Sequence, residues 1–403
     1  MGHCLVKNMY NNAFGCFVVD KNNKQYIDFQ MGSGTHLLGH SFLKNNGIEK
    51  LLDNGIFYSN SSQSNLLEEK ISSLYDSDRV IFCSTGSEAN EKAIRACKAY
   101  TGKTKIAMFS GSWHGSCDSL LYQEDWSVLG CERDLKYPLR VATASTGIND
   151  TGDVDIYPYN SVYALESLES NLDQYAAVII EPVQGSNPRE NVRPYLKKLE
   201  RIVKDNNVPL IFDEIVTGFR VGMQGIQGWY GLNPDITTLG KVIGGGFPIG
   251  VIVGNRDILE IDGVYYGGTF SGHPISCSAG NIIFDYLENN PDIYEELYVD
   301  TEKIVDSISE EIEDYPVQIL KCQSFFRFVF TDDRIKERRD REDSEDYSTF
   351  LKFRDLLEQR GVLVGTNGIF FVCPEHNFYK DRYIQQIIES LKDVTIGSET
   401  NLV

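Results

Sequence analysis

Hydrophobic and polar positions follow two different patterns along this chain of 403 residues. In the first fifty residues, short apolar runs are separated by turn residues, which predicts short strands. Further on, segments with helical spacing (66–75, 88–100, 195–207) alternate with short apolar runs typical of buried strands (79–84, 105–111, 176–182, 208–214). This alternation predicts an α/β fold with an open, mostly parallel sheet covered by helices.

The pattern changes after about residue 276, where it becomes helical and then mixed. We therefore expect a large domain over residues 51–285 and a smaller C-terminal α/β domain over residues 286–403. Residues 331–346 carry mostly charges of both signs, and we interpret this segment as a solvated connector or an exposed helix.

Composition restricts the partners. The formal net charge is −20, which argues against nucleic acid and anionic membranes but leaves a small-molecule substrate open. The nine cysteines include no CxxC pair, which is typical of reduced thiols in a cytosolic protein. We find no signal-peptide pattern and no apolar run of membrane-spanning length, so we expect a cytoplasmic location.

One lysine has an unusual context. In the stretch LGKVIGGGFPIG, residues 239–250, Lys241 precedes three consecutive glycines. A nucleotide-binding phosphate loop would need its glycines before the lysine and Ser or Thr after it, so that interpretation fails. The glycines instead indicate backbone that bends sharply or approaches another group closely.

Four predicted strands end in residues that could bind a ligand or take part in a reaction. Ligands of open parallel sheets bind at this edge. The turn of Thr85, Gly86 and Ser87 opens a helix and offers N–H groups and hydroxyls to a phosphate, although Thr85 with Glu88 also fits a simple capping box. Trp113 follows the next strand and could stack on a ring or merely pack.

Two carboxylates end the other strands. Glu181 could simply be solvated at the rim of the sheet. Asp213 follows five largely apolar residues, and a buried carboxylate requires a compensating partner. A phosphate cradle, a flat ring, a buried acid and Lys241 together describe a site for pyridoxal 5′-phosphate, in which Lys241 forms the Schiff base and Asp213 pairs with the ring nitrogen.

The chain resembles the class III, fold type I, pyridoxal-phosphate aminotransferases. The motifs that carry the resemblance are STGSEANEKAIRACKAYTGKTKIAMFSGSWHG, VIIEPVQG, LIFDEIVTGFR, PDITTLGKVIGGGFPIG and GGTFSGHP, in this order. The resemblance implies a seven-stranded type of large-domain sheet. It also implies a small domain built from both termini, with residues 1–50 joining it. The DEIVTGFR motif is nearest to the glutamate-1-semialdehyde aminomutase branch.

The resemblance also implies residue roles. Thr85, Gly86 and Ser87 would hold the phosphate, Trp113 and Ile215 would face the two sides of the ring, and Glu181 would lie near it. Lys241 would be the Schiff-base lysine and proton carrier, and Asp213 would meet the ring nitrogen. Thr269 would reach the phosphate across the interface of a homodimer with two shared sites.

Two departures from the aminomutase pattern favour a different substrate. Ser33 stands where that branch has an aromatic residue, and residues 120–145 replace its glycine-rich loop with a longer, charged one. We therefore expect an aminotransferase that moves an amino group from an amino donor to a ketone or aldehyde, with an intramolecular aminomutase as the alternative. Decarboxylases and racemases of the same fold rank third.

Other classes fit less well. Retention of Lys241 and Asp213 argues against a catalytically dead binding protein, and a nicotinamide oxidoreductase lacks its GxGxxG motif here. Ser33, Thr35 and His36 are candidates for the substrate entrance. Arg327 and Arg220 are candidates for a substrate carboxylate, although an ordinary salt bridge is the simpler interpretation of each.

Two histidine contexts are interpreted as turns. His36 and His40 have metal-ligand spacing, but their glycine-broken context favours a turn, and we expect no metal. His273, between Gly272 and Pro274, is interpreted in the same way.

Overall fold

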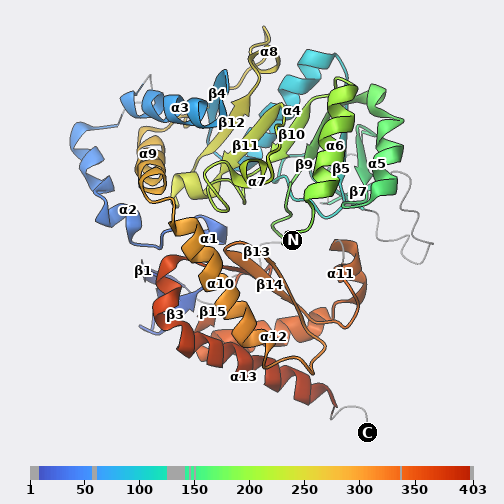
Figure 1. Ribbon diagram of the computed structural model, residues 1–403. Coiled ribbons are helices and arrows are strands. Elements are labelled where there is room, and N and C mark those ends of the chain that lie inside the picture. Colours follow the sequence, from blue (N-terminus) through green and yellow to red (C-terminus); the bar gives the residue numbers. More distant parts are fainter. Residues whose placement is uncertain are drawn as a thin grey trace.

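The computed structural model describes residues 9–56, 61–124, 141–144, 147–148, 151–335 and 338–399. Its largest sheet has seven strands in the order β4-β12-β11-β10-β9-β5-β8 and fills the upper half of the molecule in Figure 1. In that order the strands are Arg79–Cys83, Gly250–Gly254, Ile236–Gly240, Leu210–Asp213, Tyr175–Ile180, Lys105–Phe109 and Val154–Tyr157.

The strand directions bring the chemistry to one edge. Strands β11, β10, β9, β5 and β8 pair in parallel, whereas β12 runs antiparallel to both β11 and β4. The carboxyl ends of β4, β5, β9, β10 and β11 therefore meet at the same edge, and β12 starts there. The predicted α/β class and mostly parallel sheet are confirmed.

Helices cover both faces of this sheet because successive strand residues point to opposite sides. On β10, Ile211 packs in the cluster that holds the apolar face of α4 (Gly86–Thr101). Leu210 and Phe212 pack in the cluster that holds α6 (Arg193–Asp205). The other helices of this half are α3 (Ser62–Tyr75), α5 (Val162–Glu169), α7 (Gly225–Tyr230), α8 (Arg256–Leu259) and α9 (Pro274–Asn289).

The lower half of Figure 1 combines the two ends of the chain. Strand β3 (Gln25–Asp28) pairs in parallel with β15 (Val362–Leu363) and antiparallel with β2 (Phe17–Asp20), which pairs with β1 (Tyr10–Phe14). A three-stranded sheet contains β13 (Gln318–Cys322), β14 (Phe325–Val329) and β16 (Ile369–Phe371). The helices here are α10 (Ile293–Ser309), α11 (Arg338–Ser344), α12 (Tyr347–Arg360) and α13 (Lys380–Glu399).

Short elements connect these parts: α1 (Met31–Gly34), α2 (Phe42–Asn45), the β6–β7 pair (Tyr122–Glu124, Val141–Thr143) and 3-10 turns at Ile48–Asn54, Leu172–Gln174, Lys241–Gly244 and Pro374–Tyr379. No described helix combines the length and the apolar character that crossing a bilayer requires. Most of the predicted long, charged loop, residues 125–140, lies outside the described residues.

Candidate active site

A cavity of about 340 Å³ opens at the carboxyl edge of the large sheet. The turn of Thr85, Gly86 and Ser87 lines it, together with Trp113, Glu181, Asp213, Ile215 and Lys241. The fold therefore brings together residues from five separate strand ends, those of β4, β5, β9, β10 and β11. Residues 246–249, which lead into β12, close another wall.

The N-terminus of α4 forms one wall. Thr85 caps the helix by accepting a hydrogen bond from the Glu88 amide at 3.1 Å, and Glu88 Oε2 accepts one from the Ser84 amide at 2.6 Å. The N-cap bond of Thr85 is therefore present, but Glu88 returns its bond to the amide of Ser84 and not to that of Thr85, so the capping box is incomplete. The N–H groups of the first helical turn have no intrahelical acceptors and face an anion favourably. A Cβ on Gly86 would come 2.7 Å from Ile215 Cδ1, so only glycine lets the turn approach Ile215 so closely.

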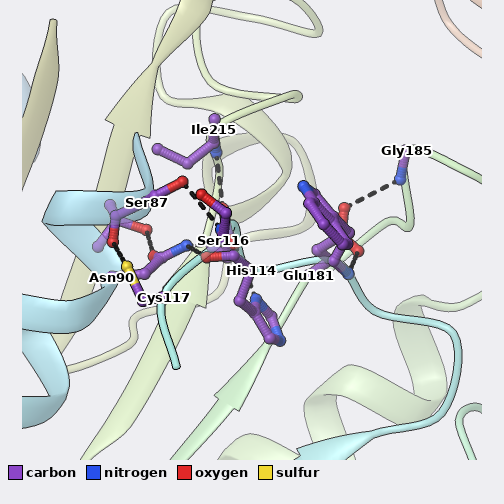
Figure 2. Close-up of polar contacts among 11 residues, drawn as sticks. Ser87, Asn90, His114, Ser116, Cys117, Glu181, Gly185 and Ile215 are labelled. Carbon is purple, nitrogen blue, oxygen red and sulfur yellow. Dashed lines mark hydrogen bonds and ion pairs between the residues drawn. The ribbon is translucent and has the colours of Figure 1, made fainter. Parts of the chain in front are cut away.

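Asp213, the last residue of β10, is buried within a hydrogen-bond network that includes Asn90, His114 and Ile215, which Figure 2 labels. Its Oδ2 accepts a hydrogen bond from Asn90 Nδ2 at 2.7 Å and lies 2.8 Å from His114 Nδ1. Its Oδ1 accepts from the Ile215 amide at 3.1 Å. Asn90 is itself oriented by Thr238, whose hydroxyl donates to Asn90 Oδ1 at 2.6 Å. The carboxylate is thus held rigidly.

Glu181 follows β9 and is also buried. It accepts hydrogen bonds from the amides of Trp113 at 2.8 Å and Gly185 at 3.2 Å, and Figure 2 shows the second bond. Burial, and then the nearby charge of Asp213, raise the pKa of Glu181 to about 7, although His114 and the two hydrogen bonds oppose the shift. Glu181 therefore titrates near neutrality and can hold or release a proton there.

Lys241 begins the 3-10 turn that follows β11, with a φ of 47°. Its ammonium makes no hydrogen bond or ion pair with the residues that the structure describes. Burial lowers the pKa of Lys241, although the charges of Glu181 and Asp213 act to raise it. A partly buried lysine with a lowered pKa and an unengaged amine is suited to nucleophilic chemistry on a carbonyl group.

Two of the three glycines after Lys241 are required by the backbone. Gly245 and Gly246 have φ angles of 54° and 103°. A Cβ on Gly246 would lie 2.4 Å from His36 Cε1, and one on Gly245 would lie 2.7 Å from Leu43 Cδ1. The glycine run therefore allows a sharp bend and a close approach, as the sequence indicated.

The remaining cavity contacts come from Trp113, which is half exposed, and from Ile215, Val216 and Thr35. His36 packs behind the glycine turn, and burial, with the neighbouring His40, lowers its pKa to about 4. His40 Nε2 lies 2.8 Å from Asp28 Oδ2. Among the described residues, no group of His, Cys, Asp and Glu has the arrangement of a metal site.

Several predicted substrate or cofactor residues lie elsewhere. Ser33 and Thr269 are exposed, and neither lines the cavity of its own chain. His273 caps α9 by accepting from the Ile275 amide at 3.2 Å. The guanidinium of Arg220 donates to Gly34 O at 2.9 Å and Ser324 Oγ at 3.1 Å, and thereby joins the two halves of the molecule.

Arg327 forms a buried cluster outside the cavity lining. Its guanidinium donates to both oxygens of Glu345, at 2.9 and 3.0 Å, and their side chains are only 5% and 4% exposed. Arg341 of α11 lies 3.6 Å from the same carboxylate and donates to Ser186 O at 3.0 Å. The charged segment 331–346 is therefore partly buried, unlike the predicted solvated connector, because its charges pair with each other and with β14.

The sequence analysis did not single out three residues of this network: Asn90 and His114, which contact Asp213, and Thr238, which bonds Asn90. A polar residue within the apolar face of α4 was the one available indication of Asn90. Their meeting depends on how α4 packs against β9, β11 and β12, which the sequence pattern alone does not give.

Comparison with known proteins gives concordant results. The model of the family Aminotransferase class-III matches residues 3–395. A glutamate-1-semialdehyde 2,1-aminomutase of Methanosarcina acetivorans is 36% identical over 339 residues, covering 79% of this chain and 76% of the relative. One of Cytophaga hutchinsonii is 32% identical over 403 residues, covering 95% and 90%.

Solved structures share the fold. An omega-transaminase from Sphaerobacter thermophilus matches with a TM-score of 0.85 at 23% identity, covering 96% of this chain and 91% of that one. A glutamate-1-semialdehyde-aminomutase from Pseudomonas aeruginosa matches with a TM-score of 0.83 at 19% identity, covering 96% and 88%. Because the family model spans nearly the whole chain, the protein belongs to the class-III aminotransferases, enzymes that use pyridoxal phosphate as cofactor.

Proposed function

We propose that this enzyme transfers an amino group from an amino donor to a separate ketone or aldehyde, and that Lys241 holds the cofactor as a Schiff base. One observation carries the proposal: the unengaged amine of Lys241 lines the same cavity as the buried carboxylates of Asp213 and Glu181. No other Lys or Arg lines this cavity within the described part of the chain.

The residues present fit pyridoxal phosphate. Asp213 is a buried carboxylate whose bonded neighbours are Asn90, His114 and a backbone amide. A cationic ring nitrogen beside it would stabilise its negative charge. The turn of Thr85, Gly86 and Ser87 supplies amides and hydroxyls for a phosphate. Trp113 and Ile215 supply flat and apolar surfaces for the two faces of a ring.

When bound, the cofactor supplies an electron-withdrawing ring that stabilises negative charge on the adjacent substrate carbon. Asp213 would keep the ring nitrogen protonated. Lys241 would carry a proton away from the substrate carbon, and its lowered pKa increases the fraction of free base at neutral pH. Glu181, with a pKa of about 7, holds or releases a proton beside them.

We also propose a homodimer in which Thr269 reaches the partner's phosphate. Three observations support it. Thr269 is exposed and lies outside the cavity lining of its own chain. On the same segment, Tyr265 and Phe270 are 81% and 57% exposed, which is typical of an interface. Light scattering should give twice the monomer mass, and Thr269→Ala should weaken cofactor binding without changing that mass.

Borohydride reduction of the purified holoenzyme tests the Schiff base. We expect one pyridoxyl group, which peptide mass spectrometry should locate on Lys241. The Lys241→Ala variant should lose the imine absorbance and all turnover, whereas Lys98→Ala, in the last turn of α4 and outside the cavity lining, should retain both. Labelling of another lysine, or turnover by Lys241→Ala, would contradict the proposal.

An aminomutase is the second candidate, because the curated relatives at 30–37% identity are named glutamate-1-semialdehyde 2,1-aminomutase. The two candidates differ in their need for an acceptor. Incubation of the holoenzyme with glutamate 1-semialdehyde alone, without a keto acid, should leave it unchanged if the enzyme is a transferase. Conversion of this single compound to its isomer would replace our proposal with the second candidate.

A further inference from the structure

A buried lysine lies one helical turn behind the phosphate-facing end of α4. Lys92 is 4% exposed. Its ammonium donates to Glu88 Oε1 at 2.5 Å and to the carbonyl oxygen of Tyr266. Its position outside the cavity lining means that it touches neither substrate nor ring.

Glu88 explains why a cation is placed there. Its carboxylate lies beside the turn of Thr85, Gly86 and Ser87, where it accepts the Ser84 amide. Burial alone would raise the pKa of Glu88, but the hydrogen bonds from Lys92 and Ser84 outweigh burial and lower it, so the group is ionised at neutral pH. An uncompensated carboxylate at this point would repel a phosphate bound by the same turn.

The ammonium also fixes the segment that carries Thr269. Lys92 bonds the Tyr266 carbonyl, and Arg95, one turn further along α4, donates to the Tyr265 carbonyl at 2.9 Å. The backbone passes so close that a Cβ on Gly268 would lie 3.1 Å from Glu88 Oε1. Glu91 lies 3.9 Å from Arg95, and the charge of Arg79 also acts on the Tyr266 side chain.

We propose that Lys92 is a positioning residue for the cofactor's phosphate: it neutralises Glu88 and holds the first turn of α4 against the segment that carries Thr269. The inference rests on the proposed function, because it takes this turn as the phosphate site. It gives the two members of the ion pair opposite effects. Removal of the Lys92 charge weakens phosphate binding, whereas removal of the Glu88 charge leaves it unchanged or strengthens it.

The test compares two ligands on the apoenzyme. Pyridoxal phosphate and pyridoxal, which lacks the phosphate, are titrated by absorbance into wild type, Lys92→Met, Glu88→Gln, the double variant and the control Lys98→Met. For Lys92→Met we expect the Kd of pyridoxal phosphate to rise about tenfold, from the loss of one nearby charge, and the Kd of pyridoxal to change less than about twofold. The double variant should recover most of the loss, and Lys98→Met should match wild type.

Three results would overturn the proposal: an unchanged Kd for pyridoxal phosphate in Lys92→Met, an equal loss for both ligands, or weaker phosphate-ligand binding in Glu88→Gln. Should Lys92→Met fail to fold, Glu88→Gln decides by the sign of its effect, since a purely structural ion pair would make both variants bind more weakly. Borohydride capture of either ligand at Lys241 reports separately on the proposed function.

Discussion

His114 Nδ1 lies 2.8 Å from Asp213 Oδ2, and both side chains are buried. The imidazole therefore shares one carboxylate oxygen with Asn90, while the other oxygen accepts only a backbone amide among its described partners. His114 Nε2 has no hydrogen-bond partner among the described residues. The bonds from Asn90 and His114 to Oδ2 fix the orientation of the Asp213 carboxylate at the edge of the cavity.

Replacement of His114 should weaken that orientation. We expect His114→Leu to lower kcat/KM by about 10- to 100-fold, because a hydrogen bond to a charged group contributes about 1.5–3 kcal/mol. His114→Asn, whose amide can still donate to Asp213, should lose less. Steady-state kinetics with a saturated cofactor measure both. Equal losses in the two variants would show that the ring itself, rather than the hydrogen bond, is needed.

Glu181 should make the stability of the apoenzyme depend on pH. Its pKa is raised to about 7 in the folded protein from an ordinary value of 4.5. Between these values the folded state binds more protons than the unfolded state, so this group's contribution is largest below pH 4.5 and is lost as pH rises through about 7. Glu181→Gln should therefore become progressively more stable relative to wild type as pH rises from 5 to about 8.

Urea unfolding of the two apoproteins across this pH range measures that difference. The hydrogen bonds lost by the amide shift the whole curve and do not depend on pH, so the slope isolates the titration. A difference that stays constant from pH 5 to about 8 would show that Glu181 is not protonated in the fold.

The glycine turn can be probed by a matched pair of substitutions. Gly246 and Gly263 both have positive φ angles, of 103° and 85°, but only Gly246 is crowded. Gly263→Ala should cost about 1 kcal/mol from backbone strain alone. Gly246→Ala should cost about 3 kcal/mol, since its Cβ must displace His36, and should also weaken cofactor binding. If chemical denaturation shows equal losses of unfolding free energy in the two variants, His36 moves aside at little cost.

Arg327 should behave as a structural residue. Arg327→Met leaves the Glu345 carboxylate buried beside Arg341 alone, and we expect a loss of about 3–5 kcal/mol of unfolding free energy. The double variant with Glu345→Gln should recover part of it. If Arg327 instead binds a substrate carboxylate, Arg327→Met would raise KM for carboxylate substrates while the melting temperature stays near that of wild type.

Much of this architecture could be predicted from sequence. The apolar runs of β9 and β10 and the helical spacing of α4 and α6 are local patterns, and they indicated the α/β class. Since parallel strands end at one edge, Glu181, Asp213 and Lys241 could be expected to meet there. Partners far apart in the chain could not be predicted: the bond from Thr238 to Asn90 depends on which strand lies beneath α4.

The charged segment shows a second limit. Its composition favoured solvent, but Glu345 is buried by the fold that brings β14 beside it. A run of mixed charges carries no information on whether its partners are water or other side chains. Contacts between elements decide this, and here they place part of a segment that resembled a connector in the interior.

The antiparallel β12 has a consequence for how this enzyme could be re-engineered. Because β12 returns directly beside β11, residues 241–249 form a loop whose two ends are fixed by the Gly240–Gly250 pair, and an insertion there would disturb the turn that begins with Lys241. Tolerance to length change is expected instead in surface connections remote from that loop. Libraries that seek new substrates should therefore diversify the rim of the pocket and leave this loop untouched.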